Sequence, residues 1–465
     1  MTTSKARKLN PIRPQNKSCP AGGSDHLHQS EVQLKSATPR GVIVAPPSAN
    51  TDHPSHPPIV LHRGFDTLAL AVKANIPDEL FQYLEKEKER ADEERRDMLI
   101  DFNGIQLQLK SHGGSGYRFI ASGGDDGATW FFKKPNSKDP WGIRLNFGSY
   151  FMAVHGLGAA KAHVDHVLDR FGIRFTDTDI SISRVDFCVD LLAPDFVLNP
   201  DNFVMSSSTG RRDHITFDDI VVSGKSGRTT SVTVGAIANR QIIIYDKRSE
   251  ILAHHKPYWW SIWNHTLREL KDRPAPYDTL HREKQAPMYR IPNVLDPADP
   301  SQSRVWRVEL RAGKNLLKDT WGIRTWADLF DKFGDLCRHS GEVVRYTDPA
   351  PSDVNRARWP NHELWEIACA EMNDDLIEMR SGVDPNPLKE VHREQHISTI
   401  FRNILGCSIT LAALEGKIPT DLPDVFDDIA QDMKDAVQTD PTKAERQFRE
   451  AKERYVFIQK PEGIG

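Results

Sequence analysis

Cysteine is scarce in this chain, which has five cysteines among 465 residues and none in a Cys-x-x-Cys pair. Their wide spacing suggests neither a zinc motif nor a disulfide framework. A chain that does not rely on disulfides is typical of a reducing compartment, so we expect a cytoplasmic protein. The cysteines are Cys19, Cys188, Cys337, Cys369 and Cys407.

Two other features that would assign a function are missing from the sequence. We find no apolar run long enough to span a bilayer and no apolar core of a signal peptide, so we expect no membrane partner. The glycine-rich run 113–116 lacks the lysine and the following helix of a phosphate-binding loop. The chain therefore shows no ATP-binding loop of its own.

The chain also lacks a strong charge of either sign. Its 61 basic and 65 acidic residues give a formal net charge of -4, so the total charge does not indicate a nucleic-acid binder. Phosphate contacts depend on local Lys and Arg rather than on the sum. Binding of DNA therefore has to be argued from local patterns.

Composition and periodicity divide the chain into four segments. Residues 1–62 are rich in Pro, Ser, Asn and His, and we predict a disordered tail, including its His26-Leu27-His28 run. Residues 63–350 alternate strand and helix patterns, residues 351–456 are helical, and residues 457–465 form a second tail. We expect an α+β fold, in which a largely antiparallel sheet carries helices on one face and a helical C-terminal region follows.

Three distant strands share an unusual feature, because each has one face that carries reactive or charged groups. Side chains alternate between the two faces of a strand, which fixes the members of each set. The carboxylates among them suit a hard divalent cation such as Mg²⁺ or Mn²⁺. The sets are Arg184, Asp186 and Asp190 in strand 180–191, Tyr245 and Lys247 in strand 241–247, and Arg307 and Glu309 in strand 304–310 with Arg311 directly after it.

If the three polar faces align in one sheet, carboxylates, cations and Tyr245 converge. The carboxylates would hold a metal ion, the cations would polarise a phosphate, and the tyrosine would attack it. A free tyrosine has a pKa of roughly 10, so it needs such neighbours to react near neutral pH. The simpler interpretation makes Asp186 and Glu309 partners in structural ion pairs and Tyr245 a packing residue.

The ordered motifs of these strands resemble those of the Rep_trans replication initiation factors, which start rolling-circle replication of plasmids and phages or nick conjugative elements. The resemblance covers about residues 64–346 and favours the catalytic interpretation. It also implies two related halves in the sheet domain. The motifs are Arg184-Val185-Asp186-Phe187-Cys188-Val189-Asp190, Ile244-Tyr245-Asp246-Lys247-Arg248-Ser249-Glu250 and Trp306-Arg307-Val308-Glu309-Leu310.

The resemblance implies a metal-dependent nick in one DNA strand at an origin, presented as a single strand or an extruded hairpin. Tyr245 would form a 5′-phosphotyrosine bond and release a 3′-hydroxyl, with Lys247 as a second catalytic residue. Asp186, Glu309 and Asp190, in that order, would hold the metal. Tyr346 and Tyr150 are rival nucleophiles. The expected DNA-binding residues are Arg184, Arg240, Arg307 and Arg311.

Other functions fit part of the pattern. The chain could bind an origin without cutting it, as a replication or regulatory protein, or it could be a metal-dependent phosphodiesterase that uses water as the nucleophile. A host helicase is a candidate partner, because a nick alone does not unwind a duplex. A second copy of the chain is another candidate partner.

Overall fold

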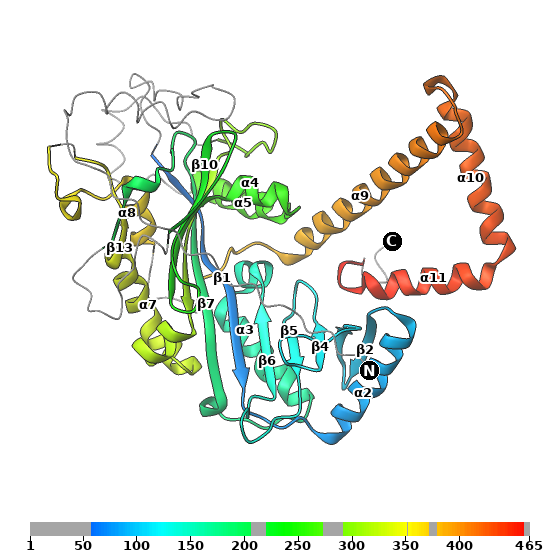
Figure 1. The fold of residues 1–465 in the computed structure, drawn as a ribbon, viewed down its shortest axis with the longest axis horizontal. Coiled ribbons are helices and arrows are strands. Elements are labelled where there is room, and N and C mark those ends of the chain that lie inside the picture. Colours follow the sequence, from blue (N-terminus) through cyan, green and yellow to red (C-terminus); the bar gives the residue numbers. More distant parts are fainter. Residues whose placement is uncertain (1–56, 206–219, 273–291, 351, 372–378, 460–465) are drawn as a thin grey trace, which may run out of the picture. The chain divides into compact units, whose positions relative to one another are not determined.

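One antiparallel sheet of eleven strands organises the protein (Figure 1). The computed structural model describes residues 57–205, 220–272, 292–350, 352–371 and 379–459, so the predicted N-terminal tail lies almost wholly outside the described residues. The order of the strands in the sheet is β2-β3-β4-β5-β6-β1-β7-β12-β11-β10-β9. The antiparallel α+β architecture expected from the sequence is confirmed.

The central pair of strands, β1 and β7, joins two halves of the sheet. We call β1–β6 the first half, and β7 with β9–β12 the second half. β1 begins at Ile59, inside the segment that we predicted as a tail. The strands are β1 Ile59–Val72, β2 Met98–Phe102, β3 Ile105–Leu109, β4 Phe119–Ser122, β5 Thr129–Phe132, β6 Ile143–Phe147, β7 Ile180–Leu192, β9 Ile220–Lys225, β10 Arg228–Gly235, β11 Arg240–Asp246 and β12 Val305–Gly313.

Helices pack on the apolar face of the sheet in both halves. In the first half, α3 lies against β1 and β6, and in the second half α7 covers the face that carries Val308 and Leu310. A further helix, α5, lies on the opposite, polar face of the sheet, where it packs against β1. Its Trp259 and Trp263 join a second core cluster that includes Leu192 of β7 and Val305 of β12. The bounds are α2 Asp78–Glu94, α3 Ser149–Arg170, α4 Lys247–Ala253, α5 Tyr258–Asp272 and α7 Trp326–Val343.

Local chemistry sets several element boundaries that the sequence pattern missed. We expected one strand over 143–151, but β6 ends at Phe147 and α3 begins at Ser149, with the extended Gly148 as its N-cap residue. We expected a helix to Met98, but α2 ends at Glu94 because Arg95 adopts a left-handed conformation with φ 52°. A short two-stranded sheet pairs β8 (Phe203–Met205) with β13 (Val344–Tyr346).

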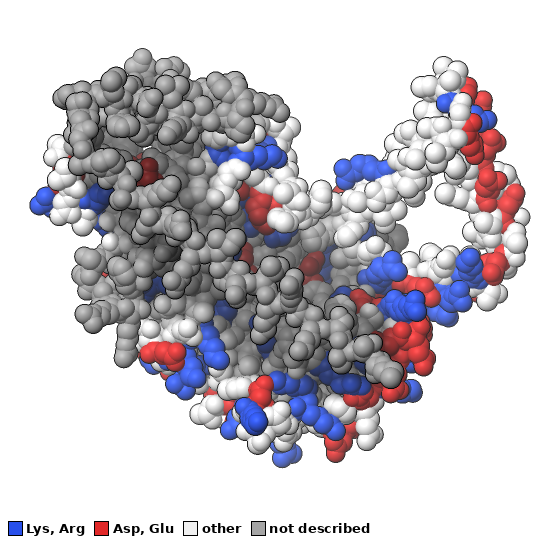
Figure 2. Space-filling view, viewed as in Figure 1, with Lys and Arg blue, Asp and Glu red and all other residues white. Residues whose placement is uncertain are grey.

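The C-terminal region is helical, as expected, with α8 (Glu363–Ala370), α9 (Pro385–Leu414), α10 (Leu422–Thr439) and α11 (Pro441–Arg454). Figure 2 shows few charges along α9 and a row of acidic residues along α10. Among the described residues, Asn386–Leu414 is the one helix long and apolar enough to cross a membrane by length and composition, and 11% of its most apolar window is buried. The expectation that no segment has these properties was therefore wrong.

Candidate active site

Strand pairing brings the three predicted polar faces together, because β12 lies between β7 and β11. Arg311 stands opposite Asp186 on one side and Gln241 on the other. Four positions earlier, Arg307 stands opposite Asp190 and Tyr245. Residues that are directly opposite in adjacent strands share a face. The carboxylates, arginines and tyrosine therefore lie on one face of the second half.

Tyr245 points along this face toward a carboxylate of the neighbouring strand. Its phenol donates a hydrogen bond of 2.9 Å to Glu309 Oε2, which reaches it diagonally across the pair β11–β12. Glu309 is 1% exposed. Burial and, next, the charge of Glu309 hold the pKa of Tyr245 well above its ordinary value. Tyr245 is therefore a neutral phenol, with an acceptor for its proton already in contact.

Asp186 is buried beside two arginines. The Nε of Arg184 lies 2.9 Å from each Asp186 oxygen, and the Nε of Arg311 lies 3.9 Å from Asp186 Oδ2 and 2.6 Å from Glu309 Oε1. Burial raises the pKa of Asp186 to about 7; the hydrogen bond from Arg184 lowers it and the charge of Glu309 raises it further. Asp186 and Glu309 are thus two buried carboxylates that share the guanidinium of Arg311.

These carboxylates form a pair rather than the predicted triad. In the part of the chain that the structure describes, no group of three His, Cys, Asp or Glu side chains is placed to hold a metal ion. Mg²⁺ usually takes one or two carboxylates and completes its shell with water and substrate phosphate oxygens. Asp186 and Glu309 fit that requirement, because a divalent cation would also offset the repulsion that contributes to the raised pKa of Asp186.

Asp190, the third predicted ligand, is held in a different network at the other end of the face. Arg307 Nε and Nη2 bind its two oxygens at 2.5 and 2.8 Å, and the indole of Trp263 donates to Oδ2 at 2.9 Å. Arg307 also pairs with Asp66 and lies 4.4 Å from the ring centroid of Trp259. Burial alone would raise the pKa of Asp190, but the charge and the hydrogen bond of Arg307, with the charges of His62 and Lys247, together lower it below its ordinary value.

That network is enclosed, which bears on the expected DNA contact of Arg307. Both Arg307 and Asp190 are 0% exposed. A buried pair of this kind strongly destabilises the fold when one partner is removed, because the other charge is left uncompensated. Arg307 therefore has no exposed surface with which to contact DNA, and its ion pairs stabilise the fold. Arg184 and Arg311, in contrast, have side chains that are 31% and 30% exposed.

The remaining predicted residues are also buried. Lys247 is the first residue of α4 and forms an ion pair of 2.7 Å with Glu250, while its Nζ lies 5.7 Å from the ring centroid of Tyr245. Arg240 lies on the opposite face of β11, where it is 4% exposed and its Nε donates to Ser340 Oγ at 3.0 Å. The structure thus does not bring Arg240 to the polar face.

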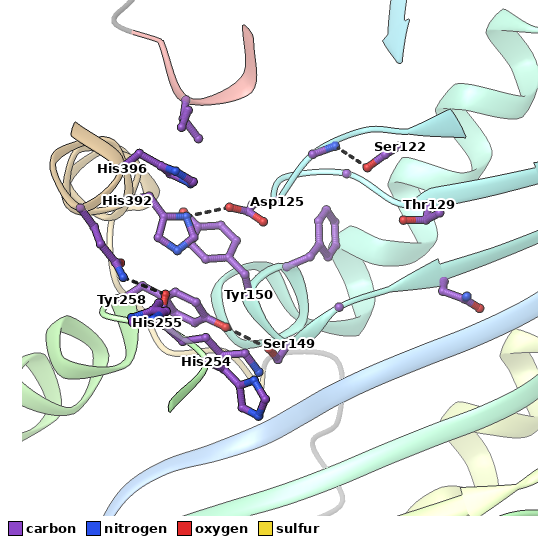
Figure 3. Close-up of a pocket in the computed structure, with 18 of the residues that line it drawn as sticks. Ser122, Asp125, Thr129, Ser149, Tyr150, His254, His255, Tyr258, His392 and His396 are labelled. Atoms are coloured by element: carbon purple, nitrogen blue, oxygen red, sulfur yellow. Dashed lines mark hydrogen bonds and ion pairs between the residues drawn. The ribbon is translucent and has the colours of Figure 1, made fainter. Parts of the chain in front are cut away.

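The two rival tyrosines lie in other surroundings. Tyr346 is buried, and its hydroxyl donates to the Val197 carbonyl and accepts from the Asn199 amide. Tyr150 lies in a cavity of about 650 Å³ with Tyr258 and His392, as Figure 3 shows. Burial raises the pKa of both tyrosines, that of Tyr346 to about 12. Glu309 contacts Tyr245 rather than either rival.

Sequence reasoning missed several residues that shape this face. Asp66 is the first residue of the strand predicted over 66–72, and its ion pair with Arg307 was not expected. Trp259 and Trp263 were expected to pack in the core, and both are fully buried, but their contact with the polar network was not expected. Their spacing of four residues on a helix was a signal that they share one face.

Comparison with known proteins identifies no family for this chain. No protein-family model matches it, and no curated protein matches it. Among solved structures it is similar to a rolling circle replication initiator protein from Geobacillus stearothermophilus, with a TM-score of 0.34 and 11% sequence identity, covering 69% of this chain and 99% of that chain. So weak a likeness assigns neither a fold nor an activity to this chain.

Proposed function

We propose that this chain is a replication initiator that nicks one DNA strand with Tyr245 as the nucleophile. The observation that carries the proposal is the 2.9 Å hydrogen bond from the Tyr245 phenol to Glu309, on the sheet face that also holds Asp186 and Arg311. A nucleophile in contact with a base that is itself oriented by a third group is the general arrangement of covalent catalysis. We propose DNA as the substrate because the ordered sequence motifs resemble those of replication initiation factors.

The proposed step uses groups that are already in contact. The phenolic oxygen of Tyr245 forms a bond to the phosphorus, and its proton passes to Glu309 Oε2. The bond between phosphorus and the 3′-oxygen breaks, and that oxygen keeps the electron pair and takes a proton from solvent. The products are a 5′-phosphotyrosine and a free 3′-hydroxyl that can prime synthesis. Arg311 remains bound to Glu309 Oε1 and fixes the carboxylate during the transfer.

A divalent metal ion is part of this proposal, with Asp186 and Glu309 as the residues that would hold it. When bound, the ion would withdraw charge from the phosphate oxygens and make the phosphorus easier to attack. Arg184 and Arg311 border the same pair of carboxylates with partly exposed guanidinium groups. They would bind the phosphate that is to be cleaved, because a guanidinium matches the geometry of two phosphate oxygens.

The test is transfer of a 3′-label from DNA to protein. Overlapping single-stranded oligonucleotides that tile the DNA encoding this chain would each carry a 3′-label and be incubated with the full chain and Mn²⁺. We expect one oligonucleotide to leave its labelled 3′ fragment on the protein, in an adduct that survives denaturation. Tyr245→Phe should abolish the adduct, and chelation of the metal should do the same.

Tyr346→Phe and Tyr150→Phe serve as controls, because both tyrosines lie away from the Glu309 contact. A wild-type level of adduct in Tyr245→Phe would overturn the assignment of the nucleophile. Cleavage without any adduct would indicate water as the nucleophile. Binding without cleavage on every oligonucleotide would leave an origin-binding protein and contradict the nicking activity.

A further inference from the structure

A second cavity adjoins the candidate active site on the same face of the sheet. It has a volume of about 500 Å³, and its lining includes Ala69 and Ala71 of β1 together with Ser183 and Arg184 of β7. Ala69 stands opposite Arg184 in the pair β1–β7, so both face the side of the sheet that carries Asp186. Arg184 thus borders this cavity and also binds Asp186 at 2.9 Å.

Three cations line the cavity without an ion pair to any described residue. Arg144 comes from β6, Lys314 follows β12, and Lys318 lies in the short helical turn Leu316–Thr320. None of the three forms an ion pair within the described part of the chain, and the buried Nε of Arg144 has no hydrogen-bond partner there. The acidic residue of the lining, Asp139, is bound to Lys133. The cavity therefore keeps an uncompensated positive charge.

Two aromatic side chains complete the lining. Tyr117 and Trp141 are half-buried, so each keeps exposed surface. The Tyr117 ring is braced by Phe131, whose centroid is 5.9 Å away, and by Lys133, whose Nζ is 4.6 Å from the ring centroid. Cations that follow a backbone beside aromatic rings on which bases stack are the features that bind single-stranded nucleic acid.

We infer that this cavity binds single-stranded DNA flanking the scissile phosphate, with phosphates on Arg144, Lys314 and Lys318 and a base stacked on Trp141 or Tyr117. The position of the strand next to the cleaved bond rests on the proposed nicking function; the binding chemistry of the cavity does not. A duplex would offer phosphates to the cations, but its bases are stacked on one another and closed to the aromatic rings. The cavity therefore favours a single strand.

The test measures binding in the Tyr245→Phe background, so that no covalent chemistry intervenes. A labelled oligo-dT and a duplex of the same length would be titrated at several salt concentrations. We expect Arg144→Gln/Lys314→Gln/Lys318→Gln to weaken oligo-dT binding at least tenfold near 0.1 M salt. The slope of log affinity against log salt should fall by about 2, since each single-strand phosphate contact contributes about 0.7.

A matched control removes three lysines from helices elsewhere, as Lys86→Gln/Lys161→Gln/Lys332→Gln in α2, α3 and α7. It changes net charge equally and should weaken binding less than twofold. Trp141→Ala should weaken oligo-dT binding at least fivefold and leave duplex binding unchanged, because stacking requires an open base. Equal losses in the two triple variants, or equal losses for duplex and single strand, would overturn the inference.

The two proposals fail separately. If no oligonucleotide is cleaved or forms an adduct but the cavity variants still lose single-strand binding, the nicking function falls and the binding site stands. If adducts form through Tyr245 but the cavity triple variant binds oligo-dT as well as its control does, the binding site alone falls.

Discussion

The two halves of the sheet differ in whether the charged side chains on their common polar face form ion pairs. In the second half, each carboxylate of β7 and β12 is bound to an arginine within the sheet. Strands β4, β5 and β6 of the first half carry no carboxylate, and Arg144 has no ion-pair partner among the described residues. Paired groups position chemistry, whereas cations without an ion pair among the described residues attract a charged partner. Lys314 and Lys318, which follow β12, join Arg144 in that second set.

Replacing one arginine in each half gives the largest expected contrast in stability. Arg307→Met would leave Asp190 and Asp66 without their partner and should lower the free energy of unfolding by about 3–5 kcal/mol. Arg144→Met removes a side chain that has no ion pair among the described residues but lies over the Phe131 ring, 5.7 Å from its centroid, and should change the free energy of unfolding by about 1 kcal/mol or less. Urea unfolding of both variants measures the difference. Similar losses would contradict the division between the halves.

Acid should weaken the fold through two buried histidines of the first half, His62 in β1 and His163 in α3. Burial lowers the pKa of His62 and of His163 to about 4, below the ordinary value of 6.5. As the pH falls from 6.5 toward 4, the unfolded chain binds protons that the folded histidines do not, so stability falls over that window. At pH 5 the effect of His62, which is 5% exposed, is about 2 kcal/mol.

Histidine-to-phenylalanine variants test the contribution of each histidine. His62 packs on Trp259 and His163 packs on Phe147, so an aromatic ring should be tolerated at either position. Each variant should lose less stability than the parent chain between pH 7.5 and pH 5 in urea unfolding. The double variant should be the least sensitive. An unchanged pH dependence in both single variants would show that the histidines are not the groups that titrate.

A smaller contrast concerns one buried tryptophan in each half. The indole of Trp263 donates to the charged Asp190, whereas the indole nitrogen of Trp130 has no partner in the described structure. Tryptophan-to-phenylalanine substitution removes a similar volume at both sites, but only Trp263→Phe removes a hydrogen bond to a charge. We expect Trp263→Phe to cost about 1.5 kcal/mol more than Trp130→Phe in urea unfolding. Equal costs would remove this difference between the halves.

The sequence predicted which residues share a face, because the two-residue period of a strand is independent of the rest of the fold. That is why Asp186, Glu309 and Tyr245 lie together as expected. The order of the strands was not predictable, since β12 enters between β7 and β11 although it follows both in the chain.

The burial of Asp190 under a helix was equally impossible to predict from the sequence. Asp190 and Asp186 are four residues apart on one strand and look alike as metal ligands, but α5 covers Asp190 and supplies Trp263 to it. The basic cavity was missed for a related reason, because its cations come from β6 and from the turn after β12, which long stretches of sequence separate. Each of these features depends on contacts between distant segments.

The long central strands have a mechanical consequence. β1 and β7 pair from Ile59 and Leu192 at one end to Val72 and Ile180 at the other, with three register shifts between, and this long pairing joins both halves. A hinge between the halves would break those hydrogen bonds, so the halves keep a constant separation. The distance between the basic cavity and Tyr245 is therefore fixed by the sheet. If both proposals hold, a DNA strand bound at the cavity would be cut a set number of nucleotides away, whatever bases lie between.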